Sequence, residues 1–292
     1  MTWGAAAALA AAGLVQAASR PPLSEPARPR PRIVSLNVAG IPVVHPRLSA
    51  RLRAIGEELK AGGYDVAALQ EVWRSADARR LGDAAGLPYR ARPPQARPFG
   101  DGLLLLSRFP ILESRELRFS SRSDRWRLLD GELFAHKGAQ LARIAAPGGP
   151  WDVYNAHLVA DYAAYGNPET RLSQARELAE WIWRHSPGRP VILAGDLNMT
   201  RGDPAYRLLA GLLRLQDACD AAGRDACAGS RGERRIDFIL LPAGSARPLE
   251  AGVAFSGVLE EDGRSYRLSD HLGIAVRLGV APAPLSGAEL AR

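Results

Sequence analysis

The stretch that decides the fold is Val191-Ile192-Leu193-Ala194-Gly195-Asp196-Leu197-Asn198-Met199. Its apolar run between Pro190 and Gly195 is typical of a short strand that is buried on both faces. In an extended backbone, the side chains of Asp196 and Asn198 point to the same side, about 6 to 7 Å apart. Such a carboxylate and amide can direct a proton and fix an oxygen, as a site that orients water against phosphorus requires. A tight turn after a core strand explains Gly-Asp-x-Asn equally well.

Segments on both sides of this stretch predict more strands, separated by amphipathic helices. One helix presents Leu48, Leu52, Ile55 and Leu59 on one face and ends at Gly62-Gly63. A second helix begins at Pro168 with Asn167 as its N-cap, and a third covers 204–215. Apolar or alternating runs predict the other strands over 32–38, 65–70, 102–106, 112–119, 133–144, 151–158, 235–241 and 273–278.

Polar side chains occur where these apolar strands begin or end. They are Asn37, Glu71, His157, Asp196, Asn198, Asp237, Asp270 and His271. Each residue alone has an ordinary structural explanation, such as a solvated strand edge. A sandwich of two sheets would gather all these ends into one cleft, so we expect them to form an active site.

The composition indicates a basic protein with one large core. The formal net charge is +7 and almost all of it comes from arginine, because Lys60 and Lys137 are the only lysines. The loops 90–97 and 120–127 are especially rich in arginine. This balance favours an anionic partner, either a phosphodiester backbone or an acidic membrane surface, although codon bias would produce it too.

The N-terminal segment predicts export. An Ala/Leu/Val run within residues 1–18 is too short to span a bilayer but suits a signal peptide, and a mis-assigned start or an N-terminal helix is the alternative. A Pro/Arg-rich linker over 19–31, a catalytic domain over 32–280 and a loose tail over 281–292 follow. We therefore expect a secreted or periplasmic protein. In that oxidising setting, Cys219 and Cys227 should form a disulfide.

Seven motifs resemble those of the endonuclease/exonuclease/phosphatase superfamily, in the same order along the chain. They are Leu36 to Pro42, Leu69 to Trp73, Ser107 to Ile111, Asn155 to Leu158, Gly195 to Met199, Arg235 to Asp237 and Ser269 to His271. The Asn-x-x-Gly-Ile-Pro and Glu-Val-Trp elements are similar to those of the neutral sphingomyelinase branch. The resemblance covers about residues 32 to 279.

This resemblance implies a DNase I-like α/β fold, a four-layer α/β/β/α sandwich with two mostly antiparallel sheets packed face to face. It also implies a Mg²⁺-dependent phosphodiesterase, with Mn²⁺ as a possible substitute. Among the metal-site residues, Glu71 would be the principal ligand, Asn37 would sit beside it, and Asp270 would supply a second acidic group.

The resemblance also implies catalytic roles. His271 would be the general base, and Asp237 would hold its ring. Asp196 and Asn198 would position the water and a phosphoryl oxygen. His157 would stabilise the transition state or help the leaving oxygen, and Lys137 would add a cation near the phosphate.

Two departures from the superfamily pattern concern the surroundings of this site. Glu132 stands before Lys137-Gly138 where the superfamily often has an aspartate. Secreted bacterial sphingomyelinases carry an exposed aromatic hairpin near the C-terminal end, and the segment 253–267 offers only Phe255 and Tyr266.

Three functions are compatible with these features. The first is hydrolysis of a phospholipid of the sphingomyelinase or phospholipase C type, at a membrane surface, by in-line attack of an activated water. The second is a secreted DNase I-like endonuclease with nucleic acid as its substrate. A non-catalytic basic binding module is the third, although it would be expected to lose some of the site residues. No protein partner is inferred, and a monomer is expected.

Overall fold

The computed structural model describes residues 30–41, 46–93, 101–122, 137–161, 166–223, 227, 235–244 and 248–279. The predicted signal segment, the linker up to residue 29 and the predicted tail lie outside the described residues. So do Pro42, Glu132, residues 94–97 and 123–127 of the arginine-rich loops, and residues 133–136 of one predicted strand.

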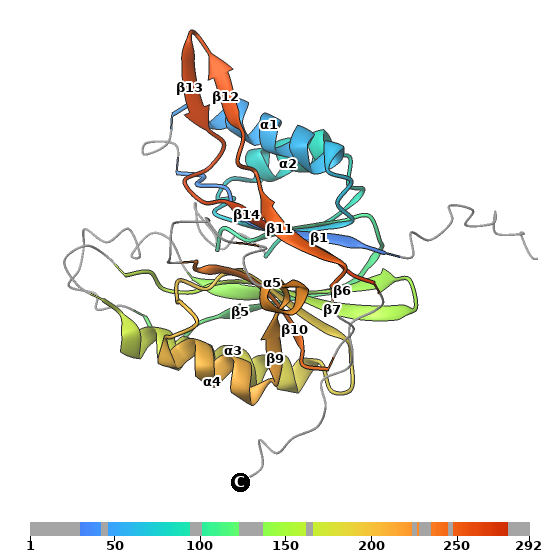
Figure 1. Cartoon of the computed structure of the whole chain (residues 1–292), viewed down its shortest axis with the longest axis vertical. Coiled ribbons are helices and arrows are strands. Elements are labelled where there is room, and N and C mark those ends of the chain that lie inside the picture. Colours follow the sequence, from blue (N-terminus) through green and yellow to red (C-terminus); the bar gives the residue numbers. More distant parts are fainter. Residues whose placement is uncertain are drawn as a thin grey trace, which may run out of the picture.

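Two six-stranded sheets lie face to face, with helices on their outer sides (Figure 1). In the first sheet the order is β11 (Glu250–Ala254), β14 (Gly273–Arg277), β1 (Arg32–Asn37), β2 (Val66–Gln70), β4 (Leu104–Ser107) and β3 (Tyr89–Ala91). In the second sheet it is β5 (Ile111–Arg118), β6 (Gly138–Ala146), β7 (Gly149–His157), β8 (Val191–Asp196), β10 (Asp237–Pro242) and β9 (Leu215–Asp217). Each six-stranded sheet contains one parallel pair among its described strands, β1 with β2 and β7 with β8. The predicted sandwich with mostly antiparallel sheets is therefore confirmed.

Helices complete the outer layers. The first sheet is covered by α1 (Leu48–Ala61) and α2 (Ser75–Ala85), and the second by α3 (Pro168–His185) and α4 (Pro204–Leu212) (Figure 1). The short α5 (Ala218–Ala222) contacts β9, β10 and β11. No helix in the described ranges combines the length and apolar composition needed to cross a membrane.

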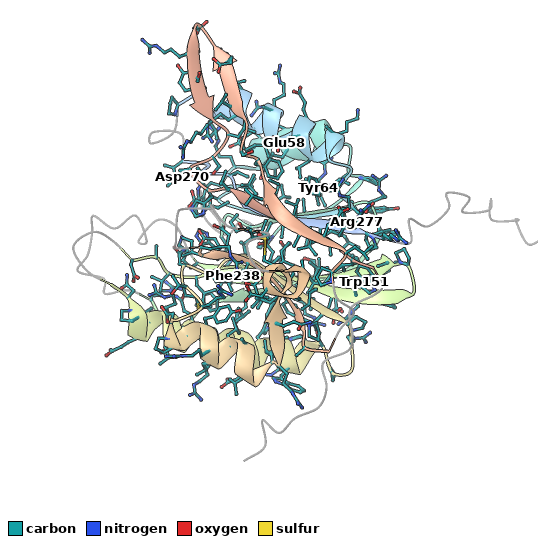
Figure 2. The ribbon with its side chains drawn as sticks, in the orientation of Figure 1. Glu58, Tyr64, Trp151, Phe238, Asp270 and Arg277 are labelled. Carbon is teal, nitrogen blue, oxygen red and sulfur yellow. A yellow bond between two sulfur atoms is a disulfide. The ribbon has the colours of Figure 1, made fainter. Side chains whose placement is uncertain are left out.

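Three apolar cores follow from these layers. Between the sheets lie Ile33, Leu105, Trp151, Ile239 and Ile274, and side chains fill this space (Figure 2). A second core joins the first sheet to α1 and α2, and a third joins the second sheet to α3 and α4. Since side chains alternate along a strand, the residues of β1 that share a face with Ile33 point toward the second sheet. This places Ser35 and Asn37 between the sheets.

Several elements were not anticipated from the sequence. The helix α2 buries Ala78, Leu81 and Ala85, but alanines give a weak apolar pattern, and the stripe also contains Asp77. The segment 253–267, in which we expected no aromatic-rich hairpin, forms a hairpin of β12 (Val258–Glu261) with β13 (Arg264–Arg267), which projects beyond α1 (Figure 1). Tyr266 is the one aromatic residue in these two strands. Asn167 does precede α3, but its side chain makes no capping bond and instead donates to the Ala160 carbonyl at 2.7 Å.

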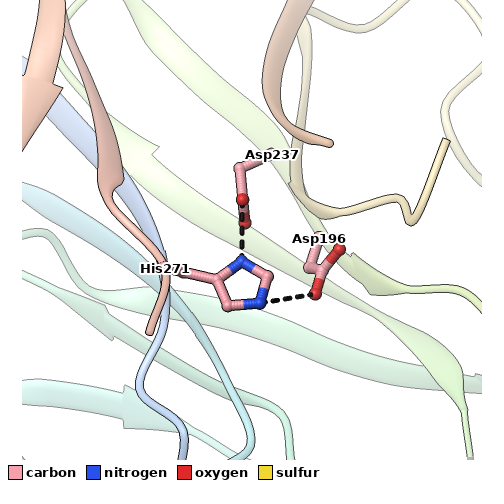
Figure 3. Close-up of side chains that lie close together, drawn as sticks. All are labelled: Asp196, Asp237 and His271. Atoms are coloured by element: carbon pink, nitrogen blue, oxygen red, sulfur yellow. Dashed lines mark hydrogen bonds and ion pairs between the residues drawn. The ribbon is translucent and has the colours of Figure 1, made fainter. Parts of the chain in front are cut away.

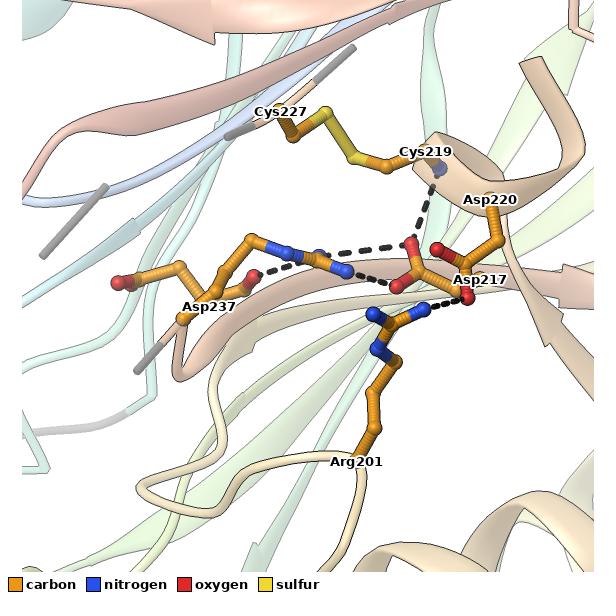
Figure 4. The surroundings of a disulfide bond; sticks show 7 residues. Arg201, Asp217, Cys219, Asp220, Cys227 and Asp237 are labelled. Carbon is orange, nitrogen blue, oxygen red and sulfur yellow. Dashed lines mark hydrogen bonds and ion pairs between the residues drawn. A yellow bond between two sulfur atoms is a disulfide. The ribbon is translucent and has the colours of Figure 1, made fainter. Parts of the chain in front are cut away.

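The expected disulfide between Cys219 and Cys227 is present, with a Cα–Cα distance of 5.8 Å (Figure 4). Its surroundings connect it to a strand that carries a predicted site residue. The Asp217 carboxylate accepts from the backbone N–H of Cys219 and pairs with Arg235. Arg235 also donates to the backbone carbonyl of Asp237 at 3.2 Å. The crosslinked segment is therefore anchored beside the start of β10.

Candidate active site

Three strand ends of the second sheet place their polar residues in one row. In the pairing register, His157 at the end of β7 lies opposite Asp196 at the end of β8. Asp196 lies opposite Asp237, the first residue of β10. The close approach of β7 and β8 requires Gly195, because a Cβ there would lie 1.9 Å from the Ala156 carbonyl oxygen. Gly195 also adopts φ 150°, which favours glycine.

Asp196 is the centre of the site. Its carboxylate accepts from the side-chain amide of Asn37 at 3.0 Å and from the backbone N–H of Asn198 at 3.1 Å. Its Oδ2 also lies 3.4 Å from His157 Nε2 and 3.7 Å from His271 Nε2. Burial raises the pKa of Asp196, but nearby His271, His157 and Lys137 outweigh burial and hold this pKa well below its usual range. Asp196 is therefore a carboxylate over the whole neutral range.

His271 connects the two sheets. It lies just before β14 of the first sheet, and its Nδ1 is 2.8 Å from Asp237 Oδ2 of the second sheet (Figure 3). Burial lowers the pKa of His271, but Asp237 and Asp196 outweigh burial and raise it to about 9. Burial, with the charge of Asp196, raises the pKa of Asp237. The pair therefore retains a proton at neutral pH, and His271 needs additional positive charge nearby to act as a base.

His157 and Lys137 form a second pair beside Asp196. The Lys137 ammonium lies 2.7 Å from His157 Nε2, and the ring is almost fully buried. With Lys137 protonated, this contact requires Nε2 to accept, which puts the ring proton on Nδ1. The arrangement places the Lys137 ammonium and the His157 ring side by side next to Asp196.

Glu71 approaches the same row from the first sheet. It follows β2, and Asn37 Nδ2 donates to its Oε1 at 3.0 Å and to Asp196 Oδ2 at 3.0 Å. Asn37 therefore bridges two carboxylates, one from each sheet. The Asn37 side-chain oxygen accepts from the backbone N–H of Ala39. In this amide orientation, its N–H₂ group rather than its oxygen faces Glu71.

The backbone at Glu71 is left-handed, with φ 61°, which is uncommon outside glycine. Two glycines make room for it. A Cβ on Gly40 would lie 1.9 Å from the Glu71 carbonyl oxygen, and a Cβ on Gly102 would lie 2.6 Å from the Trp73 ring. The two sphingomyelinase-like motifs are thus one packing unit that fixes Glu71.

The other predicted site residues lie at the margin of this row. The side-chain N–H₂ of Asn198 donates to the Leu158 carbonyl at 2.9 Å, so it joins the loops that follow β7 and β8. Asp270 is exposed. Its charge adds to that of Asp237 and Asp196 in raising the pKa of His271, and it opposes the lowering of the Arg51 pKa that burial causes. Figure 2 shows Asp270 and Arg277 at opposite ends of the first sheet.

Sequence reasoning missed two residues that hold this site together. Arg51 is buried in α1 and donates to the carbonyls of Val38, Ala39 and Leu268. It thereby clamps the loop after Asn37 to the loop before His271. The signal was available, because Arg51 falls on the apolar face of its helix. The Ser269 hydroxyl donates to the Asn37 carbonyl at 2.6 Å and accepts from the backbone N–H of His271.

The residues present fit a hard divalent cation. Glu71 and Asp196 contribute carboxylates that share one amide donor, and Asp237 Oδ1 is buried without a partner among the described residues. Ligand atoms of Asp196, Asp237 and His271 lie within 4.8 Å of one another. Oxygen-rich sets of this kind suit Mg²⁺ and Mn²⁺ better than zinc. A pocket of about 430 Å³ between 89–92 and 111–114 includes none of these residues.

The fold and this set of side chains define an α/β sandwich with a buried cluster of carboxylates and histidine at its strand ends. The chain belongs to the Endonuclease/Exonuclease/phosphatase family, whose sequence pattern matches residues 34–271. The predicted superfamily is therefore confirmed.

Relatives in sequence carry sphingolipid-hydrolase names, which confirms the resemblance to the neutral sphingomyelinase branch. The chain is 37% identical over 194 residues to a putative neutral sphingomyelinase of Drosophila melanogaster, covering 65% of this chain and 44% of that protein. It is 31% identical over 196 residues to an inositol phosphosphingolipids phospholipase C of Schizosaccharomyces pombe, covering 65% and 46%. The chain thus spans less than half the length of these relatives.

Solved structures share the fold. A beta toxin from Staphylococcus aureus has a TM-score of 0.69 at 20% identity, covering 84% of this chain and 98% of that one. A mutant beta toxin from the same organism, solved with bound magnesium ions, has a TM-score of 0.65 at 17% identity, covering 85% and 99%.

Proposed function

We propose that this chain hydrolyses the phosphodiester of a sphingolipid in a phospholipase C-type reaction that releases a phosphorylated head group and a lipid alcohol. The observation that carries the chemistry is the row of His157, Asp196 and Asp237, with His271 held by Asp237 at 2.8 Å. The choice of a sphingolipid is supported by the similarity to sphingolipid hydrolases.

His271 accepts the proton of the attacking water at Nε2, while Asp237 holds the Nδ1 proton. The water oxygen forms a bond to phosphorus, and the bond from phosphorus to the lipid oxygen breaks on the opposite side. His157, supported by Lys137, is positioned to stabilise the charge on the phosphoryl group and to donate a proton to the leaving oxygen. Asp196 Oδ2 faces the Nε2 atoms of His157 and His271, and its negative charge stabilises the protonated His271 that this step produces.

Glu71 would hold a divalent cation, with Asn37 beside it and the exposed Asp270 as a further acidic group. When bound there, Mg²⁺ or Mn²⁺ would stabilise charge on the phosphoryl oxygens and, by its own charge, favour the neutral form of His271. We further propose that the protein acts outside the cytoplasm, and the disulfide supports this location.

Three substrates offered side by side test the proposal. Purified protein is mixed with sphingomyelin vesicles, phosphatidylcholine vesicles or plasmid DNA, at matched salt, with Mg²⁺ or with EDTA. We expect Mg²⁺-dependent release of the phosphorylated head group from sphingomyelin vesicles. His271→Ala should abolish it, and His185→Ala on α3 serves as the matched histidine control.

Plasmid nicking is the informative alternative, because the net charge of +7 also suits a nucleic acid backbone. Nicking that runs orders of magnitude faster than lipid turnover would reject the lipid assignment and favour the endonuclease. Full activity in EDTA would reject the metal requirement.

A further inference from the structure

Three amide side chains are buried between the sheets, next to the site. Gln70 lies in β2, Gln140 in β6 and Asn155 in β7, and each is 0% exposed. Gln140 and Asn155 lie opposite each other in the pairing register of β6 and β7. The rest of the space between the sheets is largely apolar. These amides are not needed to fill a core, since apolar side chains of similar size would do so.

Two of the three amides join one sheet to the other. Gln70 Nε2 donates to Asn155 Oδ1 at 2.8 Å. Asn155 Nδ2 donates to the backbone carbonyls of Leu69 at 2.9 Å and Leu104 at 3.2 Å. Asn155 of the second sheet therefore binds a side chain and two backbone groups of the first sheet. Apolar contacts have no preferred direction, whereas these hydrogen bonds fix one lateral position of the sheets.

This connection lies immediately beside the residues that must be aligned. Gln70 directly precedes Glu71 in the chain. Asn155 is two residues before His157, so both side chains lie on the same face of β7. A shift between the sheets at this level would change the distance from Glu71 to His157 and Asp196, and catalytic groups tolerate errors of only about 0.5 Å.

Stability does not account for the pair. Burying two amides costs free energy unless all their hydrogen bonds are made. Gln70 Oε1 has no partner among the described residues, and neither do the two amide atoms of Gln140. A buried polar contact that brings little stability is best explained by the single arrangement that it selects.

We propose that Gln70 and Asn155 are positioning residues that set the register between the two sheets and thereby hold Glu71 at its working distance from His157 and Asp196. The inference rests on the proposed function, because it takes Glu71 as the metal ligand. It concerns the metal site as well as turnover, so it can be judged by metal binding alone.

The test replaces both amides together, Gln70→Leu with Asn155→Leu, so that neither is left unpaired. We expect unfolding in urea with EDTA to occur at the wild-type midpoint or above it. Calorimetric titration with Mg²⁺ alone should show at least about tenfold weaker binding. The kcat on a soluble phosphodiester should fall at least about tenfold, with a smaller change in KM.

Tyr154→Phe is the matched control. Tyr154 neighbours Asn155 on β7 and is equally buried, but its hydroxyl meets Ser186 at 2.5 Å on the helix side of the sheet. This variant also loses one buried hydrogen bond, and it should keep wild-type Mg²⁺ affinity. Equal losses of Mg²⁺ affinity in the control and the double variant would show a general effect of stability and overturn the proposal.

Wild-type Mg²⁺ affinity and kcat in the double variant would also overturn it. Should the double variant fail to fold, Gln70→Met removes the inter-sheet side-chain bond together with two bonds inside the first sheet, to Ser35 and to the Ala68 carbonyl. It leaves the Asn155 bonds to Leu69 and Leu104 in place and must weaken Mg²⁺ binding in the same direction. If the wild-type protein binds Mg²⁺ but hydrolyses no lipid, the proposed function fails while the positioning inference is still decided by the affinities. A wild-type protein that binds no Mg²⁺ would reject both.

Discussion

Gly102 and Gly188 offer a comparison that isolates the packing of Trp73. Both glycines have φ 64°, so replacing either with alanine forces the same left-handed backbone. That conformation costs about 1 to 2 kcal/mol, partly offset by about 0.4 to 1 kcal/mol because alanine restricts the unfolded chain. A Cβ at Gly188 meets nothing within 4 Å, whereas a Cβ at Gly102 would lie 2.6 Å from the Trp73 ring. Displacing a packed ring costs a further amount of about 1 to 3 kcal/mol.

We therefore expect Gly188→Ala to lower the free energy of unfolding by about 1 kcal/mol, and Gly102→Ala to lower it by about 2 to 4 kcal/mol. Urea denaturation in EDTA measures both without a metal contribution. Only Gly102→Ala should also weaken Mg²⁺ binding, because Trp73 lies two residues after Glu71. Equal destabilisation by the two substitutions would refute the claim that the Trp73 ring leaves no room for a side chain at position 102. Unchanged Mg²⁺ affinity in Gly102→Ala would show that the packing of Trp73 does not influence the metal site.

Three further predictions concern the catalytic pair, pH and the disulfide. His271→Ala and Asp196→Ala should each lower kcat at least about a hundredfold with the fold retained. Asp237→Ala should have a smaller effect if Asp237 only orients the His271 ring. Steady-state kinetics measures kcat, and circular dichroism checks the fold. The folded-state pKa of His271 is raised to about 9, so its stabilising contribution is complete below about pH 6.5 and is lost as pH rises through 9. The unfolding free energy in EDTA should fall by about 3 kcal/mol across that window, and a flat profile in the wild-type protein would contradict the pairing with Asp237. Reduction of the bond between Cys219 and Cys227, which are 8 apart in sequence, should lower stability by about 2 to 3 kcal/mol, and an unchanged urea midpoint after reduction would show that the crosslink adds nothing.

The layers were predictable because the strands and long helices have strong apolar patterns. The run from Val191 to Ala194 is fully buried, as an uninterrupted apolar strand should be. The helix carrying Leu52 and Ile55 ends where Gly62 follows it. In contrast, α2 has an alanine-rich face that covers the sheet through close approach, so its pattern is weak. The β12–β13 hairpin is polar and half exposed, and a two-residue turn at Asp262-Gly263 is the one signal that could have revealed it.

The candidate site was predictable as a set of strand ends, but its internal geometry was not. Residue types at the ends of apolar runs indicated Glu71, His157 and Asp196. Pairing partners depend on which strands become neighbours, and this is a property of the whole sheet order. Asn37 bridges two carboxylates, and one of them, that of Asp196, is 159 residues away in the sequence. Likewise, the left-handed backbone at Glu71 depends on Gly40, which no local pattern connects to it.

Gly195 would look like a catalytic residue in a mutational survey that measures activity alone. It carries no chemistry, yet any side chain there would collide with the Ala156 carbonyl and part β7 from β8. Parting those strands also parts His157 from Asp196. A survey of every substitution that scores only turnover would rank Gly195 beside Asp196 as if both were catalytic. A parallel score of folded protein would separate them, because replacing Asp196 leaves the strands together and replacing Gly195 does not.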